Sequence, residues 1–71
     1  MDRVQVESRS IRSIGYELQN ATLEIEFTHG GVYEYYGVPP SDYEELMGAP
    51  SKGVGFHEII RARGYPYTRV K

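Results

Sequence analysis

A glycine turn, a tyrosine-rich run and two prolines follow one another at residues 30–40, GGVYEYYGVPP, and this stretch restricts the fold more than any other. Before it stands LEIEF, residues 23–27, whose apolar and acidic residues alternate as in a half-buried strand. Glycines between two such runs are typical of a hairpin loop. Pro39 and Pro40 cannot continue a central strand, but proline fits the first turn of a helix. The stretch therefore predicts a β-hairpin that is followed directly by a helix.

The apolar pattern also predicts the register of this hairpin. A three-residue loop over residues 29–31, with its last glycine left-handed, would place Phe27 opposite Tyr33. Ile25 would then lie opposite Tyr35, and all four side chains would share one face of the sheet. We expect that face to be the core, so these tyrosines are predicted to pack inward rather than to stack on a ligand.

The same register gives the opposite face of the hairpin an acidic character. Glu26 would lie opposite Glu34, a pairing that destabilises a sheet unless a cation is near. We expect an arginine from the first strand or from the C-terminal segment, Arg69 included, to supply that cation. Tyr36 would point to this face too, where it is the better candidate for stacking on a base.

The N-terminal segment is predicted to be a strand with an interruption. Apolar residues recur at a spacing of two in two short runs, which are Val4 and Val6, then Ile14, Tyr16 and Leu18. Ile11 and Ile14 lie three apart, so we expect a bulge or a short turn near residues 10–13.

Two short helices and a last strand are predicted after the prolines. Gly48 and Pro50 end the first helix, and Ser51 can cap the second, whose buried stripe is Phe56, Ile59 and Ile60. The run YPYTRV, residues 65–70, is typical of an edge strand because it contains a proline. The predicted fold is α+β: one domain over residues 1–71, with an antiparallel sheet of three to four strands in the order β-β-β-α-α-β and two short helices on one face.

Charge is segregated along the chain although the net charge is only −2. Residues 13–51 contain seven acids and no Lys or Arg, whereas residues 52–71 contain five cations and one acid, a balance of +4. Such a segment is typical of a basic surface that binds phosphate. Alternatively, the acidic and basic segments neutralise each other in the fold.

Several classes of chemistry are not supported by the sequence. There is no cysteine for a disulfide or a thiolate metal site, which suits a reducing cytoplasm. No apolar run reaches the ~20 residues of a membrane helix, and the charged start is unlike a signal peptide. His57-Glu58 resembles the start of a zinc-protease motif, but Arg61 stands where the second histidine is needed. We therefore expect no metal, no cofactor and no enzymatic activity.

The candidate binding residues are mostly basic and lie late in the chain. A nucleic-acid surface is predicted from Lys52, His57, Arg61, Arg69 and Lys71, with Tyr36. The turn of Ser51, Lys52 and Gly53 is a candidate anion-binding turn. The competing interpretation is a tight interhelical turn that needs glycine for its backbone angles. Arg63, in the last turn of the second helix, is expected to be structural.

Taken together, these features resemble the KTSC domain, a small family named from the C-terminus of some lysyl-tRNA synthetases. The matching features, in order, are LEIEF, Gly30, Tyr33-x-Tyr35, Val38-Pro39, Ser51-x-Gly53, Phe56, Ile60-Arg61 and Tyr65-x-Tyr67. They extend over roughly residues 6–70. The resemblance implies a small binding module, with RNA or another nucleic acid as partner. The alternative is a protein-interaction module that pairs with a larger protein and binds no nucleic acid.

Overall fold

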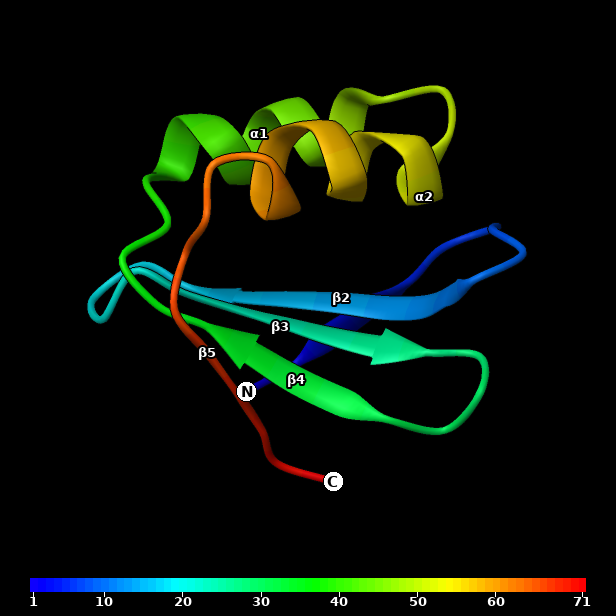
Figure 1. Cartoon of the computed structure of the whole chain (residues 1–71), viewed down its shortest axis with the longest axis horizontal. Coiled ribbons are helices and arrows are strands. Elements are labelled where there is room, and N and C mark those ends of the chain that lie inside the picture. The colour runs from blue at the N-terminus through cyan, green and yellow to red at the C-terminus, as the bar shows by residue number, and fades with distance from the viewer.

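A computed structural model describes residues 1–71 and shows an antiparallel sheet with all of its helices on one face (Figure 1). The strands lie in the order β1-β2-β3-β4-β5, and they are β1 (Arg3–Gln5), β2 (Ile11–Glu17), β3 (Thr22–Phe27), β4 (Val32–Tyr35) and β5 (Tyr67–Arg69). The helices are α1 (Pro40–Gly48), α2 (Lys52–Gly55) and η1 (Phe56–Arg61), where η1 is a π-helical turn that continues α2. The α+β class and the placement of two short helical units on one face are thus as predicted.

The sheet has five strands, so the prediction of three to four strands was wrong. The N-terminal segment is a hairpin rather than one interrupted strand, because β1 folds back on β2 and pairs Val4 with Ile14. Polar residues between the two strands form the turn, where the Ser8 hydroxyl accepts hydrogen bonds from the backbone N–H groups of Ser10 and Ile11. The predicted irregularity near residues 10–13 is present as a register shift between Ile11 and Ser13.

The β3–β4 hairpin has the predicted faces but a different register. Ile25 lies opposite Tyr33 and Leu23 opposite Tyr35, so each tyrosine faces a residue two positions earlier than expected. The loop is three residues long, as predicted, but it covers residues 28–30 and its left-handed glycine is Gly30, with φ of +108°.

The cause of this difference is a contact with another loop. The Thr28 backbone N–H donates to the Ser10 carbonyl oxygen at 2.9 Å, and the Thr28 hydroxyl donates to the Arg9 carbonyl oxygen at 2.9 Å. Thr28 is thereby bonded to the turn between β1 and β2, and it does not extend the β3–β4 ladder. The hairpin therefore closes one residue earlier than the apolar pattern predicts.

The acidic face of the sheet is partly neutralised from the first strand. The shifted register places Glu24, not Glu26, opposite Glu34. Arg3 forms an ion pair with Glu24, and a second of its nitrogens lies 3.8 Å from a Glu26 oxygen. Ser13 joins the cluster because its hydroxyl donates to Glu26 at 2.8 Å. An arginine from the first strand therefore has the predicted role, and Arg69 does not.

The core lies between the sheet and the helices. The sheet contributes Ile11, Ile14, Leu23, Ile25 and Tyr35, and the covering layer contributes Val38, Leu46, Phe56, Ile59 and Ile60. The predicted stripe of the second helix is thus buried, and Tyr35, which is 7% exposed, is a core residue as expected. Tyr33 is only half-buried and lies at the margin of the core.

Gly53, in the first turn of α2, lies close to the turn between β1 and β2. A Cβ atom at Gly53 would lie 2.8 Å from the Ser10 hydroxyl oxygen, nearer than real Cβ atoms come to other atoms. The φ angle of Gly53 is not in the left-handed region. The expectation that this turn needs glycine for its backbone angles was therefore wrong, because what glycine permits is contact between the turn and the Ser10 loop.

An ion pair ties the C-terminal segment to α1. Arg63 pairs with Asp42, which is 5% exposed, and the Tyr65 hydroxyl donates to the second oxygen of the same carboxylate. Burial alone raises the Asp42 pKa, but the hydrogen bonds from Tyr65 and Arg63, together with the Arg63 charge, hold it below its ordinary value. Arg63 thus has the structural role expected of it, though through Asp42 rather than through the helix end.

Candidate nucleic-acid interface

A groove of about 580 Å³ opens between η1 and the neighbouring strands on the helix-covered side of the sheet. We call it the aromatic groove, and its lining residues are Ser10, Phe27, His29, Tyr33, Tyr35, Phe56, His57, Arg61, Gly64, Tyr65 and Tyr67. None of them is acidic, although the chain contains ten Asp and Glu residues. The groove is therefore a surface of aromatic and basic character in a protein whose net charge is negative.

The aromatic rings of the groove form a continuous cluster. Tyr35 lies between Phe56 and Tyr67, with ring centroids 5.4 Å from each. Phe27 packs edge-to-face against Tyr33 at 5.6 Å, and Tyr33 lies 6.0 Å from Tyr67. Tyr67 is 62% exposed. Buried rings thus support an exposed tyrosine, Tyr67, and a half-buried one, Tyr33.

Three of the predicted basic residues lie around this groove. His57 and Arg61 are exposed residues of η1, and they lie one turn apart at the rim of the aromatic groove. The Arg69 guanidinium carbon lies 5.8 Å from the centre of the Tyr33 ring. Ion pairs in the fold involve only Arg3 and Arg63, so no side-chain carboxylate neutralises Arg61 or Arg69. The Arg69 Nε donates to the Lys71 main-chain oxygen at 3.2 Å.

The Tyr35 hydroxyl is uncharged at neutral pH. Burial raises its pKa to about 12, the nearby Arg61 charge lowers it, and Tyr67 and Tyr33 raise it. The floor of the groove therefore presents a neutral phenol that can donate or accept a hydrogen bond, and an anionic ligand meets no negative charge there.

The remaining predicted residues lie outside the aromatic groove. Tyr36 is half-buried on the acidic face, where its hydroxyl donates to Glu34 at 3.3 Å. The Lys71 backbone N–H bonds to the Val32 carbonyl oxygen at 3.2 Å, beyond the end of β5. Tyr36 and the groove therefore lie on opposite faces of the sheet, and the structure does not bring them together.

The predicted anion-binding turn lies beside the groove rather than within it. The Ser51 hydroxyl accepts a hydrogen bond from the Val54 N–H at 3.3 Å, so it caps α2. The Lys52 ammonium donates to the Ala49 carbonyl oxygen at 2.6 Å. These residues and Gly53 line a separate hollow that adjoins the groove.

Sequence reasoning missed Tyr67, His29 and Phe27 as parts of the site. Tyr67 pairs with Tyr35 across β4 and β5, and this pairing brings it to the groove side. The alternation of Tyr67 and Arg69 was a usable signal, since both had to share one face of the last strand. His29 stacks on Phe27 with ring centroids 5.3 Å apart, a contact that depends on the observed loop.

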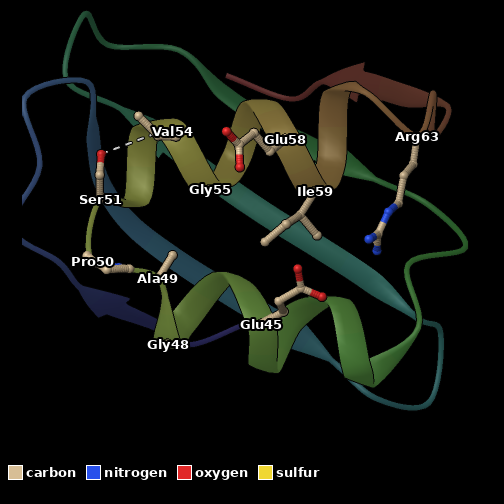
Figure 2. A pocket seen from close by; sticks show the side chains of 10 residues that line it. All are labelled: Glu45, Gly48, Ala49, Pro50, Ser51, Val54, Gly55, Glu58, Ile59 and Arg63. Carbon is tan, nitrogen blue, oxygen red and sulfur yellow. Dashed lines mark hydrogen bonds between the residues drawn. The ribbon is translucent and has the colours of Figure 1, made fainter.

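A cleft of about 680 Å³ between the two helical units is a poorer candidate (Figure 2). Figure 2 shows Glu45 on α1 and Glu58 on η1 beside it, with Arg63 reaching toward α1 from the C-terminal side. The cleft contains two carboxylates, and its single arginine already pairs with Asp42. It therefore has no free cation and is unsuited to a polyanion.

Two classes of site have no counterpart in the fold. No three side chains of the His, Asp or Glu type gather closely enough to hold a metal ion. No helix has the length and the apolar character needed to span a membrane.

Comparisons with known proteins agree on one family. A family model described as the KTSC domain matches residues 7–65. An uncharacterised protein of Stutzerimonas stutzeri is 39% identical over 70 residues, which is 99% of each chain. The crystal structure of a KTSC domain protein from Yersinia pestis superposes with a TM-score of 0.93 at 37% identity, covering 99% of this chain and 97% of that one.

A third relative is much longer than this chain. A lysine–tRNA ligase of Nostoc punctiforme is 47% identical over 57 residues, which is 80% of this chain but only 10% of the ligase. The similarity therefore concerns one small part of that enzyme. These matches confirm the resemblance inferred from the sequence motifs, and the family description names no reaction.

Proposed function

The chain belongs to the KTSC domain family, and we propose that it is a non-catalytic module that binds single-stranded nucleic acid, RNA above all, in the aromatic groove. The observation that carries this proposal is that the groove combines exposed rings with unneutralised cations and contains no carboxylate. Occurrence of a similar domain within a lysine–tRNA ligase supports RNA over DNA. The absence of cysteine fits a cytoplasmic setting.

The geometry of the groove fits the way proteins hold single strands. Such proteins combine stacking of bases on aromatic rings, which contributes about 1–3 kcal/mol per base, with basic residues that follow the backbone. Here Tyr67 and Tyr33 supply the rings, and Arg61 and Arg69 lie beside them. Duplex RNA offers no free base faces, so an unpaired segment is the favoured ligand.

The opposite face of the sheet does not suit the same ligand. Glu24, Glu26 and Glu34 lie on it, and only Arg3 pairs with any of them. A polyanion is repelled there, so the proposed ligand approaches from the groove side. The net charge of −2 predicts only modest non-specific affinity.

The test is a titration of a fluorescent single-stranded RNA of about eight nucleotides, within the usual site size of small single-strand binders. Binding should weaken steeply between about 50 and 200 mM salt, because phosphate contacts release counterions. Tyr67→Ala should weaken binding about 5- to 150-fold, the equivalent of one lost stacking contact. No binding at high micromolar protein in low salt refutes the proposal.

A matched control distinguishes the two faces of the sheet. Tyr36→Ala also removes a tyrosine, but from the acidic face. We expect it to bind RNA as the unmodified chain does. Equal losses in Tyr67→Ala and Tyr36→Ala would mean that the groove is not the site.

The second candidate function is pairing with a protein through β5. All three residues of this edge strand are exposed, and β5 pairs only with β4, so an extended peptide can add to its free edge. A pulldown with and without nuclease separates the two proposals. Protein recovered in equal amount after complete removal of RNA would favour the edge-pairing function.

A further inference from the structure

A second hollow, of about 440 Å³, adjoins the aromatic groove and shares Ser10 and His57 with it. It lies between the turn of residues 7–10 and residues 50–54, where α2 begins. We propose that this basic hollow binds the phosphate of the nucleotide whose base stacks in the groove. The inference rests on the proposed function and names the ligand unit as a nucleotide rather than a base alone.

The charges around the basic hollow favour an anion. Arg9, Lys52 and His57 line it, against the single carboxylate of Glu7. Arg9 takes part in no ion pair of the fold. Lys52 donates to the Ala49 carbonyl oxygen at 2.6 Å, a bond that fixes the position of the ammonium group while its charge stays unneutralised. Two basic residues from separate segments thus line one space, and arginine and lysine are the side chains from which phosphate sites are built.

Hydroxyl groups add further donors to the same space. Ser8 and Ser10 both line the hollow. The Ser8 oxygen accepts from two backbone N–H groups, at 3.3 Å each, so its own hydrogen is available to a ligand. Hydroxyl groups of this kind commonly contact phosphate oxygens in nucleic-acid complexes.

The hollow and the groove are parts of one preformed surface. Gly53 lies so close to Ser10 that a Cβ atom there would be 2.8 Å from the Ser10 hydroxyl oxygen, which would have to move. The Ser10 carbonyl accepts from the Thr28 N–H at 2.9 Å, which fixes the same turn to the hairpin loop beside the groove. A ligand that spans both hollows therefore needs little ordering of the protein, which favours binding.

The continuity of the two hollows selects the class of ligand. His57 stands at their junction, and no acidic residue lines the groove side of it. A molecule with an aromatic ring in the groove can therefore place an anion in the basic hollow without crossing a negative surface. A nucleotide unit of a single strand has this layout of a flat ring beside a phosphate.

The test compares the salt dependence of RNA binding in two variants that each lose one arginine. Arg9→Ala should reduce the slope of log affinity against log salt by about 0.7, the loss of one phosphate contact on a single strand, and weaken binding at low salt. Arg12→Ala removes the same charge from an exposed residue that lines neither hollow, and its slope should match that of the unmodified chain. Melting temperatures of both variants verify that they are folded.

The outcomes separate this inference from the proposed function. If RNA binds and Tyr67→Ala weakens it, but Arg9→Ala behaves as Arg12→Ala does, the phosphate site is refuted and the binding function stands. If the unmodified chain binds no RNA, the proposed function fails and the phosphate site fails with it. A smaller slope in Arg9→Ala alone supports the assignment.

A second measurement distinguishes a nucleotide from a free anion. Inorganic phosphate and uridine monophosphate are titrated separately while the backbone amide signals are followed by NMR. The nucleotide should shift signals near Gly53 and Tyr67 together and bind more tightly than phosphate. Equal affinity for the two probes, with no shift near Tyr67, would show a general anion site and overturn the inference.

Discussion

Replacing Tyr35 with alanine removes the ring that connects the sheet to the second helix, and we expect the variant to be largely unfolded at 25 °C. The residue is 7% exposed, and its ring centroid lies 5.4 Å from the ring centroids of Phe56 and Tyr67. An aromatic residue buries about 150–250 Å², which at about 25 cal/mol per Å² contributes about 4–6 kcal/mol. Truncations of buried aromatic residues cost about 3–5 kcal/mol, which equals the whole stability expected of a domain this small.

Circular dichroism with urea and thermal denaturation measures this effect. Tyr36→Ala is the matched control, because its half-buried ring lies on the other face, and its loss should be about 1 kcal/mol. A stabilising osmolyte such as trimethylamine N-oxide should restore a cooperative transition in Tyr35→Ala. A Tyr35→Ala variant within about 1 kcal/mol of the unmodified chain would refute the assignment of this ring to the core.

Three further predictions follow from the ionisable groups. Hydrogen bonds hold the Asp42 pKa below its ordinary value of about 3.9. The stability that Asp42 contributes is therefore present above this pH and is lost as the pH falls through the lower folded-state pKa. Asp42→Asn should flatten this loss of stability at acid pH, measured by urea denaturation from pH 2 to 6. Burial raises the Tyr35 pKa to about 12, so the stability that its neutral form contributes is complete below about pH 10 and is lost as the pH rises toward 12. Tyr35→Phe should keep the stability at neutral pH and reduce the loss of stability at alkaline pH. An unchanged alkaline loss would contradict the burial of this hydroxyl. Arg3→Ala should lower the free energy of unfolding by about 1 kcal/mol, since Glu24 loses its partner. Adding Glu24→Gln to this variant should recover part of the lost free energy. Strictly additive effects of the two substitutions would refute the coupling.

The faces of the sheet were predictable from the sequence, but the register was not. Alternation in residues 23–27 determines which side chains point to the core, since the period of a strand is two. The register depends on where the hairpin closes, and a hydrogen bond from Thr28 to Ser10 decides that. No local pattern encodes a contact between two loops that lie 18 residues apart in sequence.

The strand count failed for a related reason. Residues 7–10 are polar and contain neither glycine nor proline, so they gave no strong turn signal. The structure shows that the Ser8 hydroxyl replaces that signal by bonding two backbone N–H groups. Side-chain turns of this kind leave a weaker signal in the sequence than glycine turns, so the sequence predicts one strand where the structure has a hairpin.

The candidate site was predicted in part. His57 and Arg61 lie four apart on a helix, so their common face followed directly from the sequence. Tyr67 lies in the groove because β5 pairs with β4, and these strands are more than thirty residues apart in sequence. Arg9 is in a turn without periodicity, and it borders the same hollow as Lys52 because the fold brings that turn beside the start of α2.

The outer wall of the groove is one of the two edge strands of the sheet, where low local stability is expected. β5 contributes no side chain to the buried core and lies at the free edge of the sheet, whereas Leu23 and Ile25 of β3 are completely buried. Amide protons of β5 should therefore exchange with solvent by local opening, far more often than those of β3. A ligand stacked on Tyr67 can bind only while β5 is docked, so the fraction of time that this strand spends in place directly scales the affinity of the groove.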